Sequence, residues 1–253
     1  MELNLKGKGA LVTGGSHGLG TAICYNLAAE GAIVGVNYRQ SREKAEAVVN
    51  QIKDTYHVEA IPVPGDMAQE GDIVAMFDIL EKEYSKIDIL VNNAAFCPSG
   101  PITGYTKDEW EYTFQVNVTG IFVACRELVK RLLAAKRKGR IVNISSQAAF
   151  RGSTSGHLPY DSSKGAIVSM TIGLAREVAK QGIGVNAVAP GMVRTEMVAE
   201  IWRKNKEKYL ARIPLHRIAE PEEIANVVTF LASEASSYMT GATLDLSGGM
   251  MMR

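Results

Sequence analysis

Short runs of apolar residues alternate along the chain with longer stretches in which apolar residues recur every three or four positions. The short runs have the length of strands, and most are almost continuously hydrophobic, as strands covered on both faces should be. They span residues 10–13, 32–38, 60–63, 87–91, 140–144, 184–189 and 243–246. Their repeated alternation with helices predicts a parallel sheet with right-handed crossovers, that is, a doubly wound α/β fold of about seven strands.

The stretches with helical spacing lie between these runs. They span residues 18–30, 42–54, 69–84, 107–135, 160–180 and 221–233. The 107–135 stretch is too long for one ordinary helix and contains Thr119-Gly120, so we expect two helices or a kinked one. No linker rich in proline, glycine or serine interrupts the pattern, and we expect one domain over residues 1–253.

Composition excludes several classes of protein. Of the 253 residues, 28 are lysine or arginine and 27 are acidic, so the net charge is +1. A chain this close to neutral lacks the basic face of a general nucleic-acid or anionic-membrane binder. The apolar runs are shorter than the ~18 residues of a membrane span, and the first residues lack the apolar stretch of a signal peptide. We therefore expect a cytoplasmic protein without nucleic-acid or membrane partners.

The cysteines give no sign of a disulfide framework or a metal site. Cys24, Cys97 and Cys125 are widely spaced, odd in number and form no Cys-x-x-Cys pair. Such spacing favours neither disulfides nor a zinc site.

A glycine-rich loop, Gly14-Gly15-Ser16-His17-Gly18-Leu19-Gly20, follows the first strand and opens the first helix. Glycines let the backbone approach a pyrophosphate, and the helix N-terminus offers it free N–H groups and partial positive charge. The spacing is Gly-x-x-x-Gly-x-Gly rather than Gly-x-Gly-x-x-Gly, but a dinucleotide fold places its loop at this position. We interpret the loop as a dinucleotide site; a glycine-rich turn without a ligand is the alternative.

The end of the second strand indicates which dinucleotide binds. It reads Asn37-Tyr38-Arg39-Gln40-Ser41-Arg42, with no acid before Glu43. NAD enzymes place a carboxylate here against the ribose hydroxyls, whereas an arginine suits the 2′-phosphate of NADP. Arg39 is placed to meet that phosphate, with His17, Ser41 or Arg42 assisting, so we predict NADP(H). The alternative for Arg39 is a solvated surface charge.

The cluster Tyr160-Asp161-Ser162-Ser163-Lys164 carries candidate proton-transfer chemistry. Residues four apart share a helix face, so the phenol of Tyr160 and the ammonium of Lys164 can approach one small volume. A free phenol, with a pKa of about 10, is a poor acid or base at neutral pH. A nearby cation lowers that pKa, and we expect Lys164 to do so. Tyr160 is then a candidate general acid for carbonyl reduction.

Further polar positions follow other strands. Ser145-Ser146 ends the 140–144 run, at the strand edge where ligands bind, and a hydroxyl there could contact a substrate oxygen. Asn92-Asn93-Ala94-Ala95 follows the 87–91 run, and its small residues permit close approach of a cofactor ring. Asp66 follows the third strand and either contacts adenine or caps the next helix.

Together these motifs resemble, over almost the whole chain, the short-chain dehydrogenase/reductase family. In family order they are Thr13 to Gly20, Asp66, Asn92-Asn93-Ala94-Ala95, Asn117, Ser146, Tyr160 with Lys164, and Pro190-Gly191 followed by Thr195. The resemblance implies a Rossmann fold, an NADP(H)-dependent carbonyl reductase or alcohol dehydrogenase, and a homotetramer. It is nearest to the branch that reduces 3-oxoacyl groups on acyl carrier protein. The alternatives are a sugar, polyol, steroid or cyclic-alcohol dehydrogenase, and a non-catalytic dinucleotide sensor.

The resemblance also implies roles for single residues. Tyr160 exchanges the proton, Ser146 orients the carbonyl, Lys164 binds the nicotinamide ribose, and Asn117 holds a water that links Lys164 to solvent. The implied cofactor contacts are Gly14, Ser16, His17, Gly18, Leu19, Gly20, Tyr38, Arg39, Asp66, Met67, Asn93, Ala94, Ala95, Tyr160, Lys164, Pro190, Gly191, Val193 and Thr195. Ala95 stands where the family usually has glycine.

Three further segments bear on substrate and assembly. Residues 192–215 are the expected substrate loop; the basic part, 196–214, is either a solvated helical face or a mobile lid. Acyl carrier protein is acidic, so the cations of this segment are candidate contacts for it, as are three cations of the 107–135 stretch. These are Arg203, Lys204, Lys206, Lys208 and Arg212, and Arg126, Lys130 and Arg131. The apolar end, residues 244–252, predicts a subunit contact.

Overall fold

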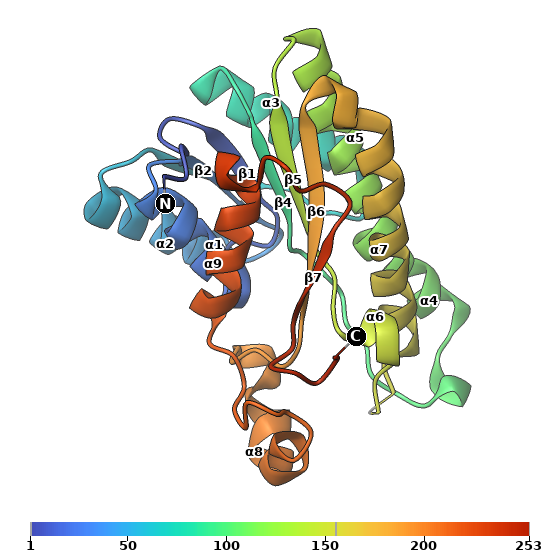
Figure 1. Ribbon diagram of the computed structural model, residues 1–253. Coiled ribbons are helices and arrows are strands. Elements are labelled where there is room, and N and C mark those ends of the chain that lie inside the picture. Colours follow the sequence, from blue (N-terminus) through green and yellow to red (C-terminus); the bar gives the residue numbers. More distant parts are fainter. Residues whose placement is uncertain (1, 155, 253) are drawn as a thin grey trace.

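The computed structural model describes residues 2–154 and 156–252, without the side chains of residues 197, 200, 201 and 204. Seven strands form one parallel sheet in the order β3-β2-β1-β4-β5-β6-β7 (Figure 1). The strands are β1 Gly9–Val12, β2 Ile33–Tyr38, β3 Ala60–Pro64, β4 Ile89–Asn92, β5 Gly139–Ile144, β6 Ile183–Pro190 and β7 Thr243–Leu246. The predicted doubly wound α/β fold is confirmed, and each predicted strand lies within two residues of its observed bounds.

Helices cover both faces of the sheet (Figure 1). One face is covered by α1 Gly18–Ala29, α2 Arg42–Tyr56 and α9 Pro221–Ala232, and the other by α3 Glu70–Tyr84, α5 Gly120–Ala134 and α7 Leu158–Val178. The remaining helices are α4 Lys107–Phe114, α6 Ala148–Arg151 and α8 Glu196–Leu210, with 3-10 turns at Ile102–Gly104, Ala179–Gln181 and Glu234–Ser236. Among the described helices, none is long and apolar enough to cross a membrane.

Burial on both sides explains why the strand sequences are almost continuously hydrophobic. Successive side chains of a strand point to opposite faces. In β1, Ala10 and Val12 join the core beneath α1 and α9, whereas Leu11 joins the core beneath α3 and α5. All three side chains are fully buried. Alternate residues of one short strand therefore pack into the two hydrophobic cores on opposite faces of the sheet.

The predicted break in the 107–135 stretch is a π-helical segment, Gln115–Thr119, which joins α4 to α5. Gly120 follows it, and a Cβ atom there would lie 2.1 Å from the carbonyl oxygen of Met67. Only glycine fits such a close approach. The wider π-helical turn holds Asn117 in the interior, with no exposed surface.

At the carboxyl end of the chain, two of the three methionines are buried. Residues 244–252 were expected at a subunit contact, which stays a prediction, while Met250 and Met251 are buried within the protein itself. Met250 packs with Ile213 and Ile218, and its carbonyl accepts a hydrogen bond from Arg151. Met252 is 77% exposed.

Candidate active site at the carboxyl edge of the sheet

A cleft of about 530 Å³ runs along the carboxyl edge of the strands, across the point where the strand order reverses between β1 and β4. Ligands of open α/β sheets bind at such a point. All of the sequence-predicted site residues except Asn117 line it. They are Gly14, Ser16, His17, Gly18, Leu19, Gly20, Tyr38, Arg39, Asp66, Met67, Asn93, Ala94, Ala95, Ser146, Tyr160, Lys164, Pro190, Gly191, Val193 and Thr195.

The glycine loop forms one end of the cleft. Gly14 and Gly18 have φ of +62° and +57°, which favours glycine, and a Cβ at Gly20 would lie 2.1 Å from the Gly14 carbonyl oxygen. His17 is the N-cap of α1, and its side chain makes no capping hydrogen bond. The first-turn N–H groups of α1 are therefore left for a ligand. This end fits a phosphate group.

Two side chains from neighbouring strands fix the loop in place. The hydroxyl of Thr13 accepts hydrogen bonds from the backbone N–H groups of Asn93 and Ala94, at 2.9 and 3.1 Å. The amide of Asn93 donates back to the carbonyls of Thr13 and Gly14, at 3.0 and 3.1 Å. The loops after β1 and β4 are thus held together. Asn93 therefore contributes to the site in part by holding the glycine loop in place.

Asn37 is a site residue that sequence reasoning missed. Its carboxamide oxygen accepts from the Gly14 N–H at 3.0 Å, and its NH₂ group donates to the carbonyls of Val63 and Gly65 at 3.2 and 3.1 Å. The side chain is 2% exposed. The available signal was a single amide at the end of the otherwise apolar β2, since a buried polar group needs partners.

Arg39 lies where the second strand leaves the sheet, and its side chain is half exposed. Its Nη1 donates to the hydroxyl of Tyr112 at 2.5 Å and lies 3.8 Å from Oδ2 of Asp66. Asp66 in turn accepts from the N–H of Ala68 at 2.9 Å. The N-cap of α3 is Gln69, so of the alternatives for Asp66, the N-cap of this helix is wrong.

Tyr160 lies in the first turn of α7, at the other end of the cleft. Ser146 lines the same cleft and acts on the Tyr160 hydroxyl as a hydrogen-bonding neighbour that lowers its pKa. The neighbouring hydroxyl of Ser145 instead donates to the backbone carbonyl of Lys164 at 3.0 Å. Of the two adjacent serines, Ser146 is therefore the one that faces Tyr160.

Lys164 is 1% exposed, and its Nζ donates to the carbonyl of Ile144 at 2.6 Å. The same Nζ lies 5.4 Å from the centre of the Tyr160 ring. Burial lowers the pKa of Lys164 to about 8, with the nearby Cys97 acting in the opposite direction.

The expected lowering of the Tyr160 pKa by Lys164 is wrong. Burial raises the pKa of Tyr160, Cys97 adds to the rise, and the hydrogen bond with Ser146 only partly opposes it. Burial removes the phenolate from water, and this loss of solvation disfavours the charged form more than the neighbouring groups stabilise it. In this structure Tyr160 is a neutral phenol at physiological pH, which is the form that can donate a proton.

Asn117 lies behind the cleft wall. Its Oδ1 accepts from the N–H of Phe96 at 2.7 Å, and its Nδ2 donates to the Phe96 carbonyl at 2.8 Å and to the Ser163 hydroxyl at 3.0 Å. The side chain therefore joins the loop after β4 to α7. That Asn117 holds a water linking Lys164 to solvent, as the resemblance implies, stays a prediction.

The loop after β4 supplies another residue of the cleft wall. Cys97 lines the cleft, and its Sγ lies 3.7 Å from Nδ1 of His157, which itself lies 2.9 Å from the Pro98 carbonyl oxygen. Burial raises the pKa of Cys97 to about 11, and Lys164 lowers it only in part. The thiol is thus protonated at neutral pH and a weak nucleophile.

The basic 196–214 segment forms α8, which projects past the carboxyl edge of the sheet (Figure 1). Trp202 packs against the cluster of Ile213, Ile218 and Met250, whereas Arg203, Lys206 and Lys208 are exposed. The segment therefore has a charged face and an apolar underside. The side chain of Lys204 lies outside the described residues.

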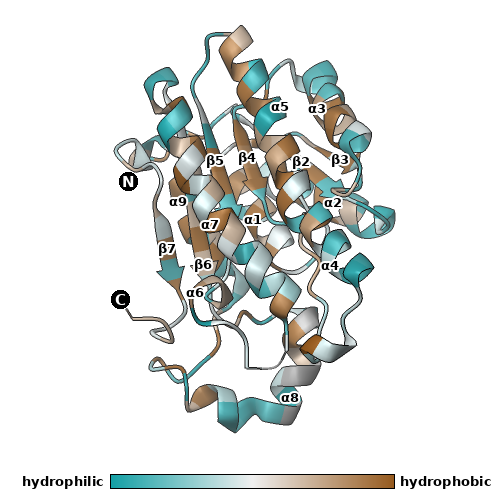
Figure 2. Ribbon diagram, turned by 90° about the vertical axis from the view of Figure 1, so that its right-hand side faces the viewer, coloured by the Kyte–Doolittle hydropathy of each residue, from teal (hydrophilic) through white to brown (hydrophobic). Residues whose placement is uncertain are grey.

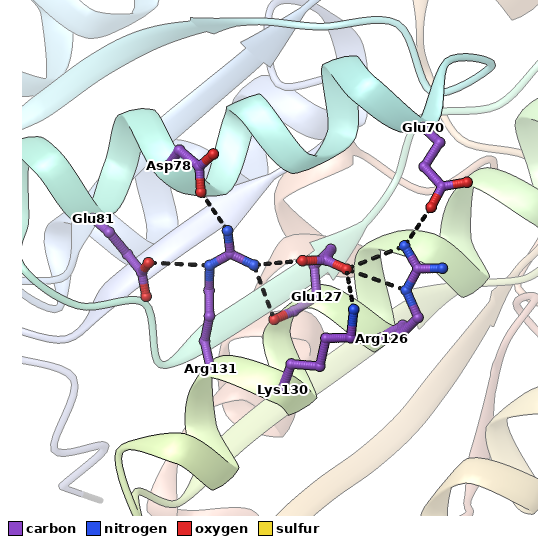
Figure 3. A network of polar contacts seen from close by, with 7 residues as sticks. All are labelled: Glu70, Asp78, Glu81, Arg126, Glu127, Lys130 and Arg131. Atoms are coloured by element: carbon purple, nitrogen blue, oxygen red, sulfur yellow. Dashed lines mark hydrogen bonds and ion pairs between the residues drawn. The ribbon is translucent and has the colours of Figure 1, made fainter.

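The three candidate cations Arg126, Lys130 and Arg131 do not form a free basic patch. Figure 3 shows them paired with carboxylates of α3 and α5. Arg131 contacts Asp78, Glu81 and Glu127 at 2.5, 3.0 and 2.6 Å. Arg126 and Lys130 also contact Glu127, at 3.1 and 3.2 Å.

Comparison with known proteins places this site in a family. A family model described as enoyl-(acyl carrier protein) reductase matches residues 14–251. The 3-oxoacyl-[acyl-carrier-protein] reductase FabG of Aquifex aeolicus is 40% identical over 250 residues, covering 99% of this chain and 100% of its own length.

Solved structures agree. A short-chain type dehydrogenase/reductase from Mycobacterium marinum is 31% identical, with a TM-score of 0.95, covering 100% of this chain and 98% of its own. The L-sorbose reductase of Gluconobacter frateurii, complexed with NADPH and L-sorbose, is 28% identical, with a TM-score of 0.92 and full coverage of both chains. With a cleft of this form and likeness along its whole length, the chain belongs to the short-chain dehydrogenase/reductase family of oxidoreductases, which use a nicotinamide dinucleotide.

Proposed function

We propose that the protein reduces the keto group of a 3-oxoacyl thioester with NADPH. The observation that carries the proposal is that the neighbouring hydroxyls of Tyr160 and Ser146 line the same cleft as the N-terminus of α1, which has no side-chain cap. The hydroxyls and the helix N-terminus belong to one continuous cavity. Substrate and dinucleotide can therefore meet beside the phenol.

The residues of the cleft fit a dinucleotide from end to end. The α1 N-terminus receives the pyrophosphate, and Lys164 is positioned for ribose hydroxyls. Arg39 receives the 2′-phosphate, which is the reason for proposing NADPH. The segment from Pro190 to Thr195 lines the nicotinamide end. When bound, the reduced nicotinamide supplies the hydride.

Tyr160 and Ser146 act on the substrate oxygen. As negative charge develops there, the Ser146 hydroxyl stabilises it, and the Tyr160 hydroxyl donates the proton that completes the alcohol. The raised pKa of Tyr160 keeps the donor protonated at neutral pH. Lys164 lines the same cleft and donates a hydrogen bond to the Ile144 carbonyl at 2.6 Å.

Two substrate classes compete. The 3-oxoacyl reductase of Aquifex aeolicus shares 40% of its residues with this chain, against 28% for the sorbose reductase. These likenesses favour a 3-oxoacyl group presented on acyl carrier protein. A sugar or polyol is the second candidate, supported by the full-length structural likeness to the sorbose reductase.

We expect Tyr160→Phe to lower the rate of NADPH oxidation with a 3-oxoacyl thioester by roughly 100-fold or more, because the variant keeps the ring and loses the proton donor. NADPH oxidation is followed with acetoacetyl-coenzyme A and, separately, with L-sorbose. Ser146→Ala is expected to lower the rate, and Ser145→Ala is the matched control, since its hydroxyl points to the α7 backbone. Normal turnover in Tyr160→Phe overturns the mechanism, and faster turnover of L-sorbose than of the thioester overturns the substrate class.

We propose further that the protein is a cytoplasmic homotetramer. Figure 2 looks at the side that carries α4, α5 and α7. Large apolar side chains are exposed on this side: Phe122 of α5 is 52% exposed and Ile172 of α7 is 42% exposed. Exposed apolar surface of this kind is suited to contact with another copy of the chain.

A further inference from the structure

We propose that Tyr112 is a positioning residue that holds Arg39 for the 2′-phosphate and so helps to set the preference for NADPH over NADH. The inference rests on the proposed use of NADPH. It goes beyond that use because Tyr112 belongs to α4, 73 positions from Arg39 along the chain, and no sequence motif connects the two.

The first step is the contact itself. An arginine side chain that is half exposed, as that of Arg39 is, samples many rotamers unless a partner restrains it. The phenol oxygen of Tyr112 accepts a hydrogen bond from Nη1 of Arg39 at 2.5 Å. The carboxylate of Asp66 lies 3.8 Å from the same nitrogen.

The second step is the geometry of the guanidinium group. Among the described residues, both partners of Arg39 contact Nη1. The opposite edge of the planar fork, which carries the parallel N–H bonds of Nε and Nη2, is left available. That edge matches two oxygens of a phosphate in a bidentate contact. The restraint therefore fixes the group without occupying the edge that would bind the anion.

The third step is the support of Tyr112. Its ring meets the Phe96 ring edge-on, with centroids 5.1 Å apart and planes at 76°. The backbone of Phe96 is held on both its N–H and its carbonyl by the buried amide of Asn117. Tyr112 is thus anchored to a fixed part of the cleft wall. A phenol held in this way can orient a neighbouring side chain.

The test measures binding of two nucleotide fragments by calorimetry. Adenosine 2′,5′-bisphosphate carries the 2′-phosphate, and AMP lacks it. We expect Tyr112→Phe to weaken binding of the bisphosphate roughly fivefold, as for loss of one hydrogen bond that orders a charged group, and to leave AMP binding unchanged. Tyr105→Phe is the matched control: its hydroxyl contacts the carbonyls of Pro98 and Gly156 and not Arg39.

A double-mutant cycle separates this inference from the proposed cofactor. Arg39→Gln should weaken the bisphosphate more than Tyr112→Phe does, and Tyr112→Phe should add nothing in the Arg39→Gln background. If Arg39→Gln leaves the ratio of the two affinities unchanged, the NADPH assignment fails and the role of Tyr112 fails with it. If Arg39→Gln lowers the ratio and Tyr112→Phe does not, or if Tyr112→Phe weakens both fragments equally, only the positioning role is overturned.

Discussion

At the scale of single residues, the buried amine of Lys164 links the stability of the protein to pH. It lies 1% exposed with the Ile144 carbonyl as its hydrogen-bond partner, and burial lowers its pKa to about 8. In the unfolded chain a lysine has a pKa of about 10.4. Between these two values the unfolded chain binds more protons than the folded protein. The contribution of Lys164 to stability therefore rises with pH across this window.

We expect this contribution to appear as a difference between wild type and Lys164→Met. From pH 7 to pH 10 the free energy of unfolding of wild type should rise relative to that of the variant, by up to about 3 kcal/mol over the full window. Urea unfolding at several pH values measures it. Buried thiols such as Cys24 and Cys125 have raised pKa values and destabilise both wild type and the variant at high pH. Comparing wild type with the variant at each pH cancels that opposite trend. A difference that stays constant with pH would show that Lys164 is not the charged, buried group described.

Site residues that belong to a recognisable sequence motif could be predicted from the sequence. The glycine loop and the Tyr160–Lys164 spacing led directly to residues that line the cleft. The sign of the Tyr160 pKa shift was not predictable, because it depends on how deeply the phenol is buried. Asn37 and Tyr112 were missed because their partners are distant in sequence and are brought together only by the sheet order.

At the scale of elements, alternating burial and turn residues were enough to predict the strands and most helices. The break between α4 and α5 was also predicted, from length and from Thr119-Gly120, but its π-helical form was not. The pairing of α5 with α3 through charges could not be read from sequence. The spacing already places Glu127 beside Arg126, Lys130 and Arg131 on one helix, and only the structure shows that Arg126 and Arg131 also reach Glu70, Asp78 and Glu81 of α3.

We expect Glu127→Gln to destabilise the protein by about 1–3 kcal/mol, because it removes a nearly buried carboxylate from three cations. Burial opposes ionisation of Glu127, but hydrogen bonds from Arg131, Lys130 and Arg126 outweigh it and lower the pKa. The contribution is therefore present above pH ~4.3 and is lost as the pH falls below that value. Thermal unfolding at pH 7 and pH 4 measures both effects.

Glu70→Gln is the matched control for this network. Glu70 also binds Arg126, at 2.6 Å, but its side chain is 62% exposed. An exposed ion pair contributes about 0–1 kcal/mol. If Glu127→Gln and Glu70→Gln lower the free energy of unfolding equally, burial of Glu127 does not strengthen its ion pairs.

At the scale of the whole molecule, the parallel sheet brings the ends of β1, β4, β5 and β6 to one edge and so builds the cleft from distant segments. The strand order was predictable in kind, since crossovers are right-handed. Which outer faces stay exposed could not be predicted from the sequence. Of the carboxyl-terminal methionines, Met250 and Met251 are buried within the chain itself, whereas Met252 is 77% exposed.

We expect light scattering to give four times the 27.3 kDa chain mass. Charging the exposed apolar side chains of α5 and α7 with Phe122→Glu and Ile172→Glu should shift the protein to smaller species, since burial of charge at a contact is costly. Ile102→Glu is the control, because Ile102 is 71% exposed but lies outside both helices. A monomeric wild type would contradict the proposed assembly.

The start of α1 carries no side-chain cap, because His17 makes no such hydrogen bond. A missing cap typically costs a helix about 1 kcal/mol, and a nucleotide phosphate seated there supplies the missing acceptors. The folded population is therefore linked by mass action to the supply of its own ligand. We expect a shortage of the dinucleotide to leave this polypeptide opening more often and more readily degraded, so that its abundance follows the supply of its cofactor.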